Sequence, residues 1–334
     1  MARNDELRMT AESLTDSVVV CGVGCCDASL ADVAFSHARY SPASALSDHV
    51  TDSTAAVVIG VDPAASGAVR GLHEALALRS GADPSASPFT VAVLPCAAVE
   101  GDTLAEVREH VDGLLLADSP ASEPESTRTS DATARASDSG ARPPASGASG
   151  ARSGDGSVVD ESLDPVERGI RELLAAVQRP GFVNLDLTDA RTVLSAGVAA
   201  IGSGTSGCDS PGSAVDAAFH RLPSAVDVDD ATAVLVDVVV DPVTSITAAT
   251  DAISAVRERI DGDANVIWGG AVDESTDGEL TVCVVVADVR YSPAVVAGDP
   301  CPRCGTTLSA YAFGARSTLS CDGCGFSGID VRRG

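Results

Sequence analysis

Two short segments of this chain combine residue types and spacings that can do chemistry. The first, residues 180–194, reads PGFVNLDLTDARTVL and sets out Asn184, Asp186 and Asp189 in the pattern N-x-D-x-x-D. Carboxylates in this arrangement can hold a cation or help to polarise a water molecule for attack. The same arrangement suits the start of a helix, with Thr188 or Asp189 as the capping residue. The spacing alone leaves both interpretations open.

The second segment holds two pairs of cysteines near the C-terminal end. Cys301 and Cys304 form one C-x-x-C pair, Cys321 and Cys324 form the other, and 16 residues separate the pairs. A glycine follows each pair and permits the left-handed turn that points backbone N–H groups at the sulfur atoms. The pattern predicts a zinc ribbon over residues 299–334 with four thiolate ligands. Because protein fills all four positions, we expect the zinc to be structural rather than catalytic.

The composition limits the class of protein. At 334 residues the chain is long enough for about two domains. Its formal net charge is −26, and all 22 basic residues are arginine, since the sequence contains no lysine. This negative charge argues against general binding to nucleic acid or to an anionic membrane. An acidic, lysine-free surface resembles that of proteins from halophilic microbes, because molar salt screens its self-repulsion.

No segment predicts a leader or a membrane span. The first 16 residues are polar and are expected to form a flexible tail, and no apolar run reaches membrane length. Six of the ten cysteines lie outside the ribbon pattern, which is typical of a reducing cytoplasm rather than of a disulfide framework. We therefore expect a cytoplasmic protein without membrane insertion.

The first half of the chain alternates between predicted strands and helices, which indicates a parallel sheet with right-handed crossovers over residues 17–117. The strands are expected at 17–23, 55–60, 90–94 and 114–116. Gly22 and Gly24 follow the first strand, and a glycine turn between strand and helix is the general architecture of a phosphate site. With only two glycines, an ordinary strand-to-helix turn explains the pattern equally well. Cys25 and Cys26 are expected to be small buried residues rather than nucleophiles, since no histidine partner is evident.

A change in composition separates this half from the next. Residues 118–160 consist mostly of Ser, Ala, Gly, Pro and Asp, and so few aliphatic side chains cannot offset the entropy of ordering. We expect a flexible linker there, and a second α/β unit over residues 161–290. The unit is predicted to begin with a helix over 164–177, whose Pro165 suits the first turn. It continues with helices over 189–199, 214–220 and 245–260, a glycine-rich turn over 202–213, and strands over 233–240, 265–272 and 280–286.

Three ordered segments of the second half resemble the FtsZ/tubulin superfamily. They read RPGFVNLDLTDARTVLS, AIGSGTSGCDSPGSAVDAAF and ANVIWGGAVDESTDGELTVCVVV. They correspond to the synergy loop, to the glycine turn with its helix, and to the paired strands of the FtsZ C-terminal domain. The resemblance implies that Asn184, Asp186 and Asp189 act on the nucleotide of a neighbouring subunit. Helix capping alone then no longer accounts for the two aspartates, although the same carboxylates can both cap the helix and face the nucleotide of a neighbouring subunit.

The first half resembles the nucleotide-binding domain of that family in altered form. Gly22 and Gly24 stand where the family has its first glycine loop, but Cys25, Cys26 and Asp27 replace the other glycines. The stretch to the next predicted strand is also short, as if one strand–helix unit were missing.

The family's phosphate-binding signature, G-G-G-T-G-[ST]-G, is altered most. The segment from Gly60 to Gly67 reads GVDPAASG in this chain. Side chains block the approach of a phosphate to backbone N–H groups, and Pro63 lacks an N–H. Asp62 places negative charge where an anion would bind. We expect Asp62 or Ser66 to cap the following helix in place of a phosphate.

Contacts to the ribose and to the base are reduced as well. Glu100 remains from a ribose-contacting motif, but Leu104 stands where the family has arginine. Asp164 aligns with an aspartate that reads guanine, while the asparagine beside it has become Leu163. The resemblance implies GTP as a ligand, and these losses argue against it.

These features favour an FtsZ-like cytoskeletal, cell-division-associated protein with a degenerate nucleotide site. The expected fold class is α/β, with a shortened Rossmann-type parallel sheet, a central helix, an FtsZ-type C-terminal α/β domain and a small zinc ribbon. Through Asp186 and Asp189 the protein would associate with FtsZ-type subunits, either its own copies or a conventional paralogue. It would then modulate or cap filaments in the cytoplasm and at the division site.

Two alternatives remain open. The first is an active FtsZ-family GTPase that polymerises and binds GTP through its altered loop. The second is a binding protein that works through the zinc ribbon, whose residues 299–334 carry four arginines and three aspartates in an otherwise acidic chain. Four arginines make a poor phosphate footprint, so we expect structural zinc and no nucleic acid partner.

Overall fold

The computed structural model describes residues 17–118 and 164–329, apart from gaps at 36–37, 64, 66, 78–86, 97–100, 261, 277, 292–296, 299–300, 302–305, 314–315 and 326. The predicted tail over residues 1–16 and all but the first residue of the predicted linker lie outside the described residues. Two separate main sheets result, one of nine strands and one of three, together with a small two-stranded pair. Among the described residues, no helix is both long and apolar enough to span a bilayer.

The first half builds five parallel strands in the order β2-β1-β3-β4-β5. Their runs of valine, leucine and isoleucine are almost wholly buried, as expected for parallel strands that helices cover on both faces. The strands are β1 (Val18–Val23), β2 (Arg39–Tyr40), β3 (Ala56–Val61), β4 (Phe89–Pro95) and β5 (Gly113–Ala117). The helices are α2 (Cys25–Ala31), the 3-10 turn Ala43–Ala45, α3 (Leu46–His49), α4 (Ala68–Ala77) and α5 (Gly101–Arg108).

The second half adds four longer strands and four helices. Strand β10 is antiparallel to both of its neighbours, β6 and β8, while β9 at the edge is parallel to β8. The strands are β6 (Val198–Gly207), β8 (Ala233–Val240), β9 (Asn265–Val272) and β10 (Glu279–Ala287), with the short pair β7 (Val226–Asp227) and β11 (Arg290–Tyr291). The helices are α6 (Pro165–Gln178), α7 (Leu187–Leu194), α8 (Pro211–His220) and α9 (Ile246–Arg259).

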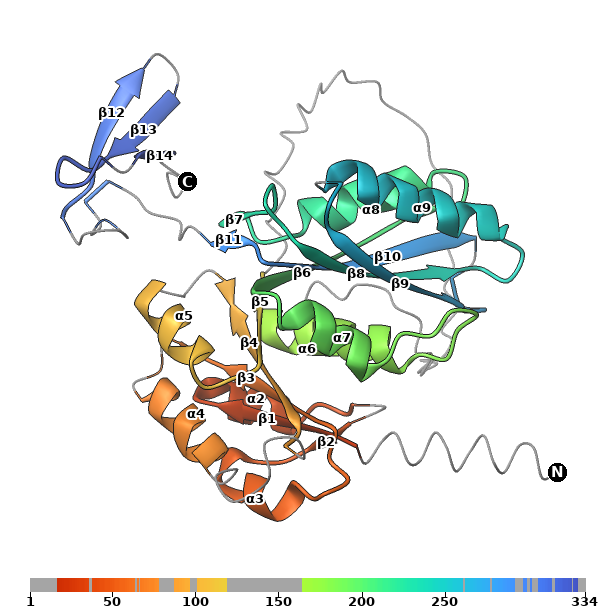
Figure 1. The fold of residues 1–334 in the computed structure, drawn as a ribbon, viewed down its shortest axis with the longest axis horizontal. Helices are drawn as coiled ribbons and strands as arrows, with labels where there is room; N and C mark the ends of the chain where they lie inside the picture. The colour runs from red at the N-terminus through yellow and green to blue at the C-terminus, as the bar shows by residue number, and fades with distance from the viewer. Residues whose placement is uncertain are drawn as a thin grey trace, which may run out of the picture.

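The two halves share one sheet, because β5 pairs in parallel with β6. The pairing is short and joins Leu114 to Val198, Leu115 to Ala199 and Leu116 to Ala200. Helix α6 lies across this seam and contacts β3, β4 and β5 on one side and β6 and β10 on the other. Figure 1 shows α6 and α7 on one side of the C-terminal strands, with α8 and α9 on the opposite side. The sheet therefore separates two apolar cores.

The segment after α7 differs from the prediction. A helix was expected over 189–199 and a glycine turn over 202–213, but α7 ends at Leu194 and β6 continues through Gly207. The glycines belong to a strand because α8 packs directly on it. A Cβ atom on Gly204 would collide with the backbone of Ala214 and Ala218 in α8. Glycine here serves close packing of a helix on a strand rather than a turn.

The C-terminal segment forms its own antiparallel sheet of β12 (Ser309–Phe313), β13 (Arg316–Ser320) and β14 (Ser327–Ile329). Among the residues of this segment that the structure describes, the buried core consists of Cys301, Leu308, Leu319 and Cys321. Two of these four buried residues are predicted zinc ligands. So small an apolar core is typical of a module that depends on a metal for stability.

Candidate functional site

The strand order of the first half marks one crevice as the expected ligand site. In the order 2-1-3-4-5 the chain runs outward in opposite directions from β1 and β3. Ligands of such sheets bind at the carboxyl ends of the strands, where the direction reverses. The loop from β1 to α2 and the loop from β3 to α4 meet at this point.

The two loops at the β1/β3 crevice lie against each other. Gly24 begins α2 with a φ of 76°, a left-handed conformation that suits glycine. A Cβ atom added to Gly24 would lie 2.9 Å from the Cβ of Ala65 and 3.2 Å from the Cβ of Asp62. The backbone N–H of Asp62 also donates a hydrogen bond to the carbonyl oxygen of Val23 at 3.2 Å. The second loop thus lies directly against the first.

Asp62 faces the first residue of α2 through its side chain. A hydrogen bond with Asp62 is the main reason that the pKa of the Cys25 thiol is raised. Burial raises the pKa of Cys26 to about 12. Both thiols therefore stay protonated at neutral pH and are poor nucleophiles. Cys26 is buried as predicted, but Cys25 is exposed, because it lies in the first turn of α2 at the surface.

The glycines of the crevice serve close packing or turns. A Cβ on Gly22 would collide with the backbone of Cys26 and Asp27, and one on Gly60 would lie 2.7 Å from Leu30 and 2.8 Å from Val166. Gly67, just before α4, has a φ of 85°.

The remaining predicted contacts divide between the described part and the gaps. Asp164 caps α6, where its carboxylate accepts a hydrogen bond from the N–H of Val166 at 2.9 Å. Its charge also raises the pKa of Cys25 and Cys26, so it lies close to the crevice. Leu104 is buried in the core. Glu100 and Ser66 lie outside the described residues.

The acid loop, residues 180–189, leads from α6 into α7. Asp186 is the capping residue of α7, where Thr188 or Asp189 was predicted. Its Oδ1 atom accepts hydrogen bonds from the N–H groups of Thr188 at 2.7 Å and Asp189 at 3.0 Å. Asp189 completes a capping box, since its Oδ2 atom accepts from the N–H of Asp186 at 3.0 Å.

Capping uses only one carboxylate oxygen of each aspartate. Among the described residues, neither Oδ2 of Asp186 nor Oδ1 of Asp189 receives a hydrogen bond. An ionised carboxylate offers about four lone-pair sites, so each side chain can still accept a proton donor from outside. Each of these two aspartates can therefore cap α7 with one carboxylate oxygen and still offer the other oxygen to a bound molecule.

The edge strand β9 holds the acid loop in place. Val183 and Gly270 exchange backbone hydrogen bonds at 3.2 and 2.9 Å, as an isolated antiparallel bridge. Leu185 is buried against Gly269, where a Cβ would lie 2.6 Å from its side chain. Asn184 is exposed, and its Oδ1 atom accepts a hydrogen bond from the N–H of Gly181 at 2.8 Å, across the turn of the loop. Asn184 thus shapes the loop.

Two exposed apolar side chains belong to the acid loop and to the strand that holds it. Phe182 is 41% exposed and its ring covers Gly270, while Val272, on the same side of β9, is 51% exposed. We call this group of residues in the loop and on β9, made by Phe182, Asn184, Asp186, Asp189 and Val272, the acid face. Phe182 and Val272 were not predicted as site residues. The only sequence signal for them is the pair Gly269-Gly270, which leaves room for a second chain segment.

A buried polar cluster between α6 and β6 was also not predicted. It surrounds a cavity of about 20 Å³, lined by residues that include Arg168, Glu172, Ser203 and Arg221. Burial raises the pKa of Glu172, while the hydrogen bond from Ser203 at 2.6 Å and the charges of both arginines lower it. Asp118 also lines the cavity, so two arginines face two carboxylates. We interpret this balanced cluster as structural.

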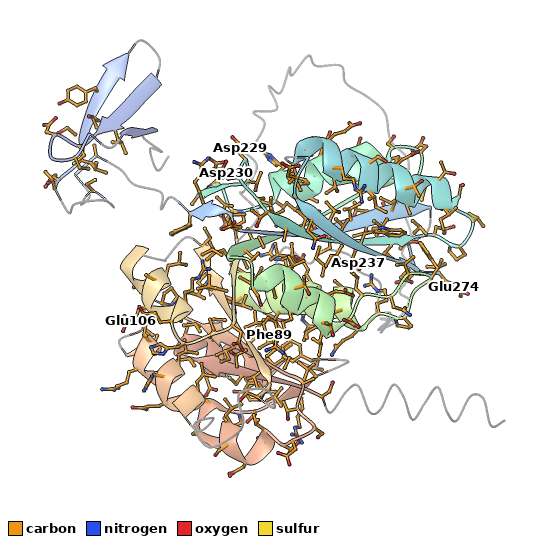
Figure 2. All side chains as sticks on the ribbon, viewed as in Figure 1. Phe89, Glu106, Asp229, Asp230, Asp237 and Glu274 are labelled. Atoms are coloured by element: carbon orange, nitrogen blue, oxygen red, sulfur yellow. The ribbon has the colours of Figure 1, made fainter. Side chains whose placement is uncertain are left out.

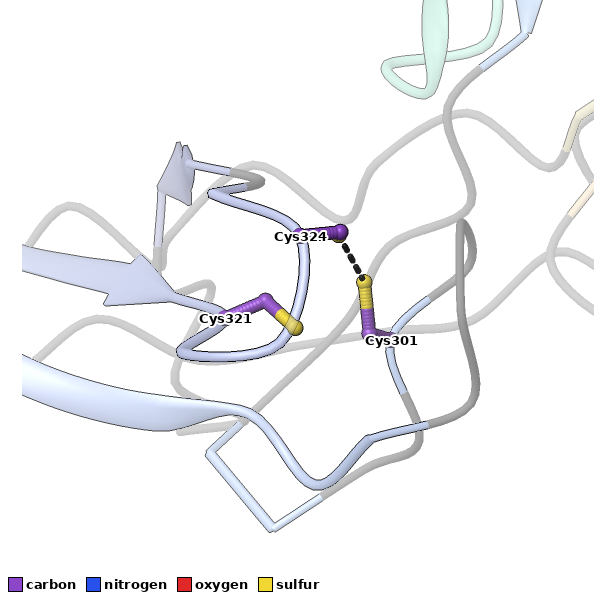
Figure 3. Close-up of side chains that lie close together, drawn as sticks. All are labelled: Cys301, Cys321 and Cys324. Atoms are coloured by element: carbon purple, nitrogen blue, oxygen red, sulfur yellow. Dashed lines mark hydrogen bonds between the residues drawn. The ribbon is translucent and has the colours of Figure 1, made fainter.

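Three of the four predicted zinc ligands converge in the ribbon. The Sγ atoms of Cys301, Cys321 and Cys324 all lie within 4.8 Å of one another, and those of Cys301 and Cys324 are 3.6 Å apart (Figure 3). Tetrahedral zinc with Zn–S bonds of about 2.3 Å separates its sulfur ligands by about 3.8 Å. The thiols thus fit zinc and are too far apart for disulfides. Cys304 lies outside the described residues.

Comparison with protein families identifies two parts of the chain. Residues 197–290 match the C-terminal domain of the FtsZ family. Residues 298–324 match a zinc finger found in FPG and IleRS. The predicted resemblance of the second half and the predicted zinc ribbon are both confirmed.

Curated relatives are cell division proteins of archaea. FtsZ 1 of Halobacterium salinarum is 40% identical over 136 residues, which cover 40% of this chain and 33% of the relative. FtsZ of Haloferax mediterranei is 37% identical over 140 residues, which cover 41% of this chain and 36% of the relative. The chain thus matches about a third of the length of these relatives.

Solved structures confirm the predicted α/β fold class. An empty FtsZ dimer of M. jannaschii superposes with a TM-score of 0.60 over 90% of this chain and 99% of that chain, at 16% identity. CetZ2 from Haloferax volcanii, in a GTPγS-bound protofilament, gives a TM-score of 0.50 over 75% and 70%, at 22% identity. At these identities the similarity shows a shared fold.

Proposed function

We propose that this chain, whose residues 197–290 form a C-terminal domain of the FtsZ family, is an FtsZ-like accessory protein with a degenerate nucleotide site. It associates with FtsZ-type subunits through the acid face and modulates or caps their filaments. The chain acts in the cytoplasm at the division site. Its zinc ribbon is a structural module held by Cys301, Cys304, Cys321 and Cys324.

The observation that supports this proposal is a contrast between two sites of one fold. In the β1/β3 crevice, where the fold favours a nucleotide, Asp62 and Ala65 lie against Gly24. In the acid face, by contrast, Asp186 is exposed and Asp189 is half-buried, and β9 holds the loop in a defined position. A protein of this kind can act on a neighbour's nucleotide but offers the next subunit no nucleotide of its own. Growth of a filament would then stop at this subunit.

The chemistry of the acid face fits such a role. Oδ2 of Asp186 and Oδ1 of Asp189 can each accept a hydrogen bond from water, which increases the nucleophilicity of that water. The same two oxygens can contribute to a cation site shared with a neighbour's phosphates. Phe182 in the loop and Val272 on β9 add exposed apolar area, and exposed apolar groups of this kind favour contact with another protein.

The test is GTP binding and turnover in molar salt. The chain alone, an FtsZ-type partner alone and their mixture are compared, using wild type and the double variant D186N/D189N. Asparagine caps a helix about as well as aspartate, so α7 stays folded while both charges are removed. The double variant D251N/D263N changes the charge equally at two exposed aspartates outside the acid face and serves as the control.

We expect the chain alone to show no GTP turnover. In the mixture we expect the wild-type chain to change the GTP turnover of the partner, and D186N/D189N, but not D251N/D263N, to abolish this change. If the carboxylates take part in proton transfer, the loss is about a hundredfold. Stoichiometric GTP on the purified chain, with turnover lost in D186N/D189N, would instead establish an active GTPase. No effect in either arm would direct attention to the zinc ribbon as a binding module.

A further inference from the structure

A partly buried ion pair ties the acid loop to the C-terminal sheet at the residue where the loop begins. Arg179 ends α6 and directly precedes Pro180. Its Nη1 atom donates to Oδ2 of Asp237 at 3.3 Å. Asp237 lies on β8, is 5% exposed, and is found between the strands and the layer of α6 and α7 (Figure 2).

Asp237 interrupts an otherwise apolar strand. The other residues of β8 are valine, leucine and alanine, and the register places Cys283 of β10 beside Asp237, with Ser203 of β6 on the far side of Cys283. Burial raises the pKa of Asp237 to about 6, and the charge of Arg179 opposes that rise. A carboxylate in this position is costly to bury unless its partner stays in place.

The surroundings of Asp237 contain few other charges. Helix α6 contributes Arg179 and Glu172, and both Glu172 and Asp237 raise the pKa of Cys283. At the end of β9, Asp273 also faces Arg179, whose charge helps to lower the pKa of Asp273. Helix α7 contacts β8 with an apolar side made of Ala190, Val193 and Leu194. Arg179 is therefore the cation that balances Asp237.

We propose that Asp237 is a positioning residue for the acid face, which holds the acid loop in place through Arg179 when it is ionised and loosens the loop when it is protonated. Neutral Asp237 no longer holds the guanidinium, which is then free to pair with Asp273 at the rim of the sheet. Because Arg179 adjoins Pro180, its displacement moves the start of the loop. The bridge between Val183 and Gly270 then weakens, and Asp186 and Asp189 lose their fixed position.

Trp268 offers a direct readout of this change, since it is the single tryptophan of the chain. It lies on β9 two residues before Gly270, so both residues face the same side of the strand, where the ring of Phe182 packs. The second readout is hydrogen exchange of residues 181–189, expressed as protection relative to the intrinsic rate at each pH.

The experiment compares wild type, D237N and R179Q between pH 5 and pH 7.5 in molar KCl. For wild type we expect a change in Trp268 emission with a midpoint near the pKa of Asp237, about 6. Loop protection should fall about tenfold or more at pH 5, because a hydrogen bond to a charged group contributes a factor of that size. D237N and R179Q should lack both transitions, and F182A should lack the change in emission alone.

Two results would overturn the proposal. One is an equal pH transition in D237N, which would assign the transition to another group. The other is constant loop protection in folded wild type across the range. D237N keeps the test decisive if R179Q does not fold, because D237N leaves only a guanidinium that is 24% exposed, whereas R179Q leaves a buried carboxylate without its partner. Far-ultraviolet circular dichroism at each pH verifies that every variant remains folded.

The effect of the loop on a partner rests on the proposed function and is tested separately. D237N is mixed with an FtsZ-type partner at pH 7.5, and the change in GTP turnover is compared with that of wild type. If loop protection follows Asp237 but the turnover of the partner is insensitive to both D237N and D186N/D189N, the positioning role stands and the proposed function fails.

Discussion

At the scale of one residue, the raised pKa of Asp237 predicts how the stability of the folded chain depends on pH. Its ordinary pKa is 3.8, and burial raises the pKa to about 6 in the folded chain. Below pH 3.8 the carboxyl is protonated in both the folded and the unfolded state. Between pH 3.8 and 6 the unfolded chain loses this proton while the folded chain keeps it, so the contribution of Asp237 to stability falls as pH rises. Above pH 6 the contribution stays constant.

The expected size is about 1–3 kcal/mol, since one unit of pKa corresponds to about 1.4 kcal/mol. Urea unfolding of wild type and D237N in molar KCl measures it, because the other carboxylates cancel in the difference. The free energy of unfolding of wild type relative to D237N should fall by this amount from pH 4 to pH 7. A difference that is independent of pH would contradict the assignment.

Single residues also show where sequence reasoning succeeds and where it fails. Asp186 and Asp189 stand out from sequence because their spacing matches a helix start and a known loop. Asp237 gives no such signal, since its partner Arg179 is 58 residues away in the chain and the contact exists only once β8 lies under α6. Phe182 is missed for the same reason, because its site is the space above Gly270 in a distant strand.

At the scale of elements, the packing of α8 on β6 predicts which glycines are essential. A Cβ at Gly204 would collide with backbone atoms of α8, whereas one at Gly212 has nothing within 4 Å. G204A should lower the free energy of unfolding by about 2–3 kcal/mol or more, because backbone has to move. G212A should raise it by up to about 1 kcal/mol, as alanine favours helix over glycine. Urea unfolding measures both, and equal effects would refute the packing argument.

The elements were predictable to the extent that side-chain pattern decides them. Runs of apolar residues identified β1, β3, β4, β5, β8, β9 and β10 to within a few residues at each end. Strand β6 was missed, because glycine and serine dominate its second half and this composition is more common in turns. Only contact with α8 turns that composition into a strand.

At the scale of the whole molecule, the separate sheets predict two units of unequal stability. The described residues of the ribbon include four buried core residues, while the nine-stranded sheet has two large cores. We expect one zinc ion per chain, and its removal by a chelator should unfold residues 298–329 alone. Hydrogen exchange over 309–320 should rise, while thermal unfolding reported by Trp268, which lies in the larger unit, should stay unchanged.

C321S should reproduce the effect of the chelator, and C208S, outside the ribbon, should behave like wild type. A fall in the Trp268 transition on chelation would show that the ribbon stabilises the larger unit. The sequence located the ribbon by its cysteine pairs. The pairing of β5 with β6 could not be predicted, because it joins three pairs of apolar residues. An apolar residue type does not indicate which strand its own strand will pair with.

The strand order has a consequence for how the protein is synthesised. Strands β1 to β5 come from one continuous stretch and can pair as soon as residue 117 has left the ribosome. In the second half, β6 and β8 both pair with β10, which at residues 279–287 is the last strand of the nine-stranded sheet to be synthesised. During translation the edges of β6 and β8 that later pair with β10 therefore stay unpaired, and unpaired strand edges are prone to aggregation. The ribbon delays chain release beyond β10, so the second half can close while the nascent chain is still held apart from its copies.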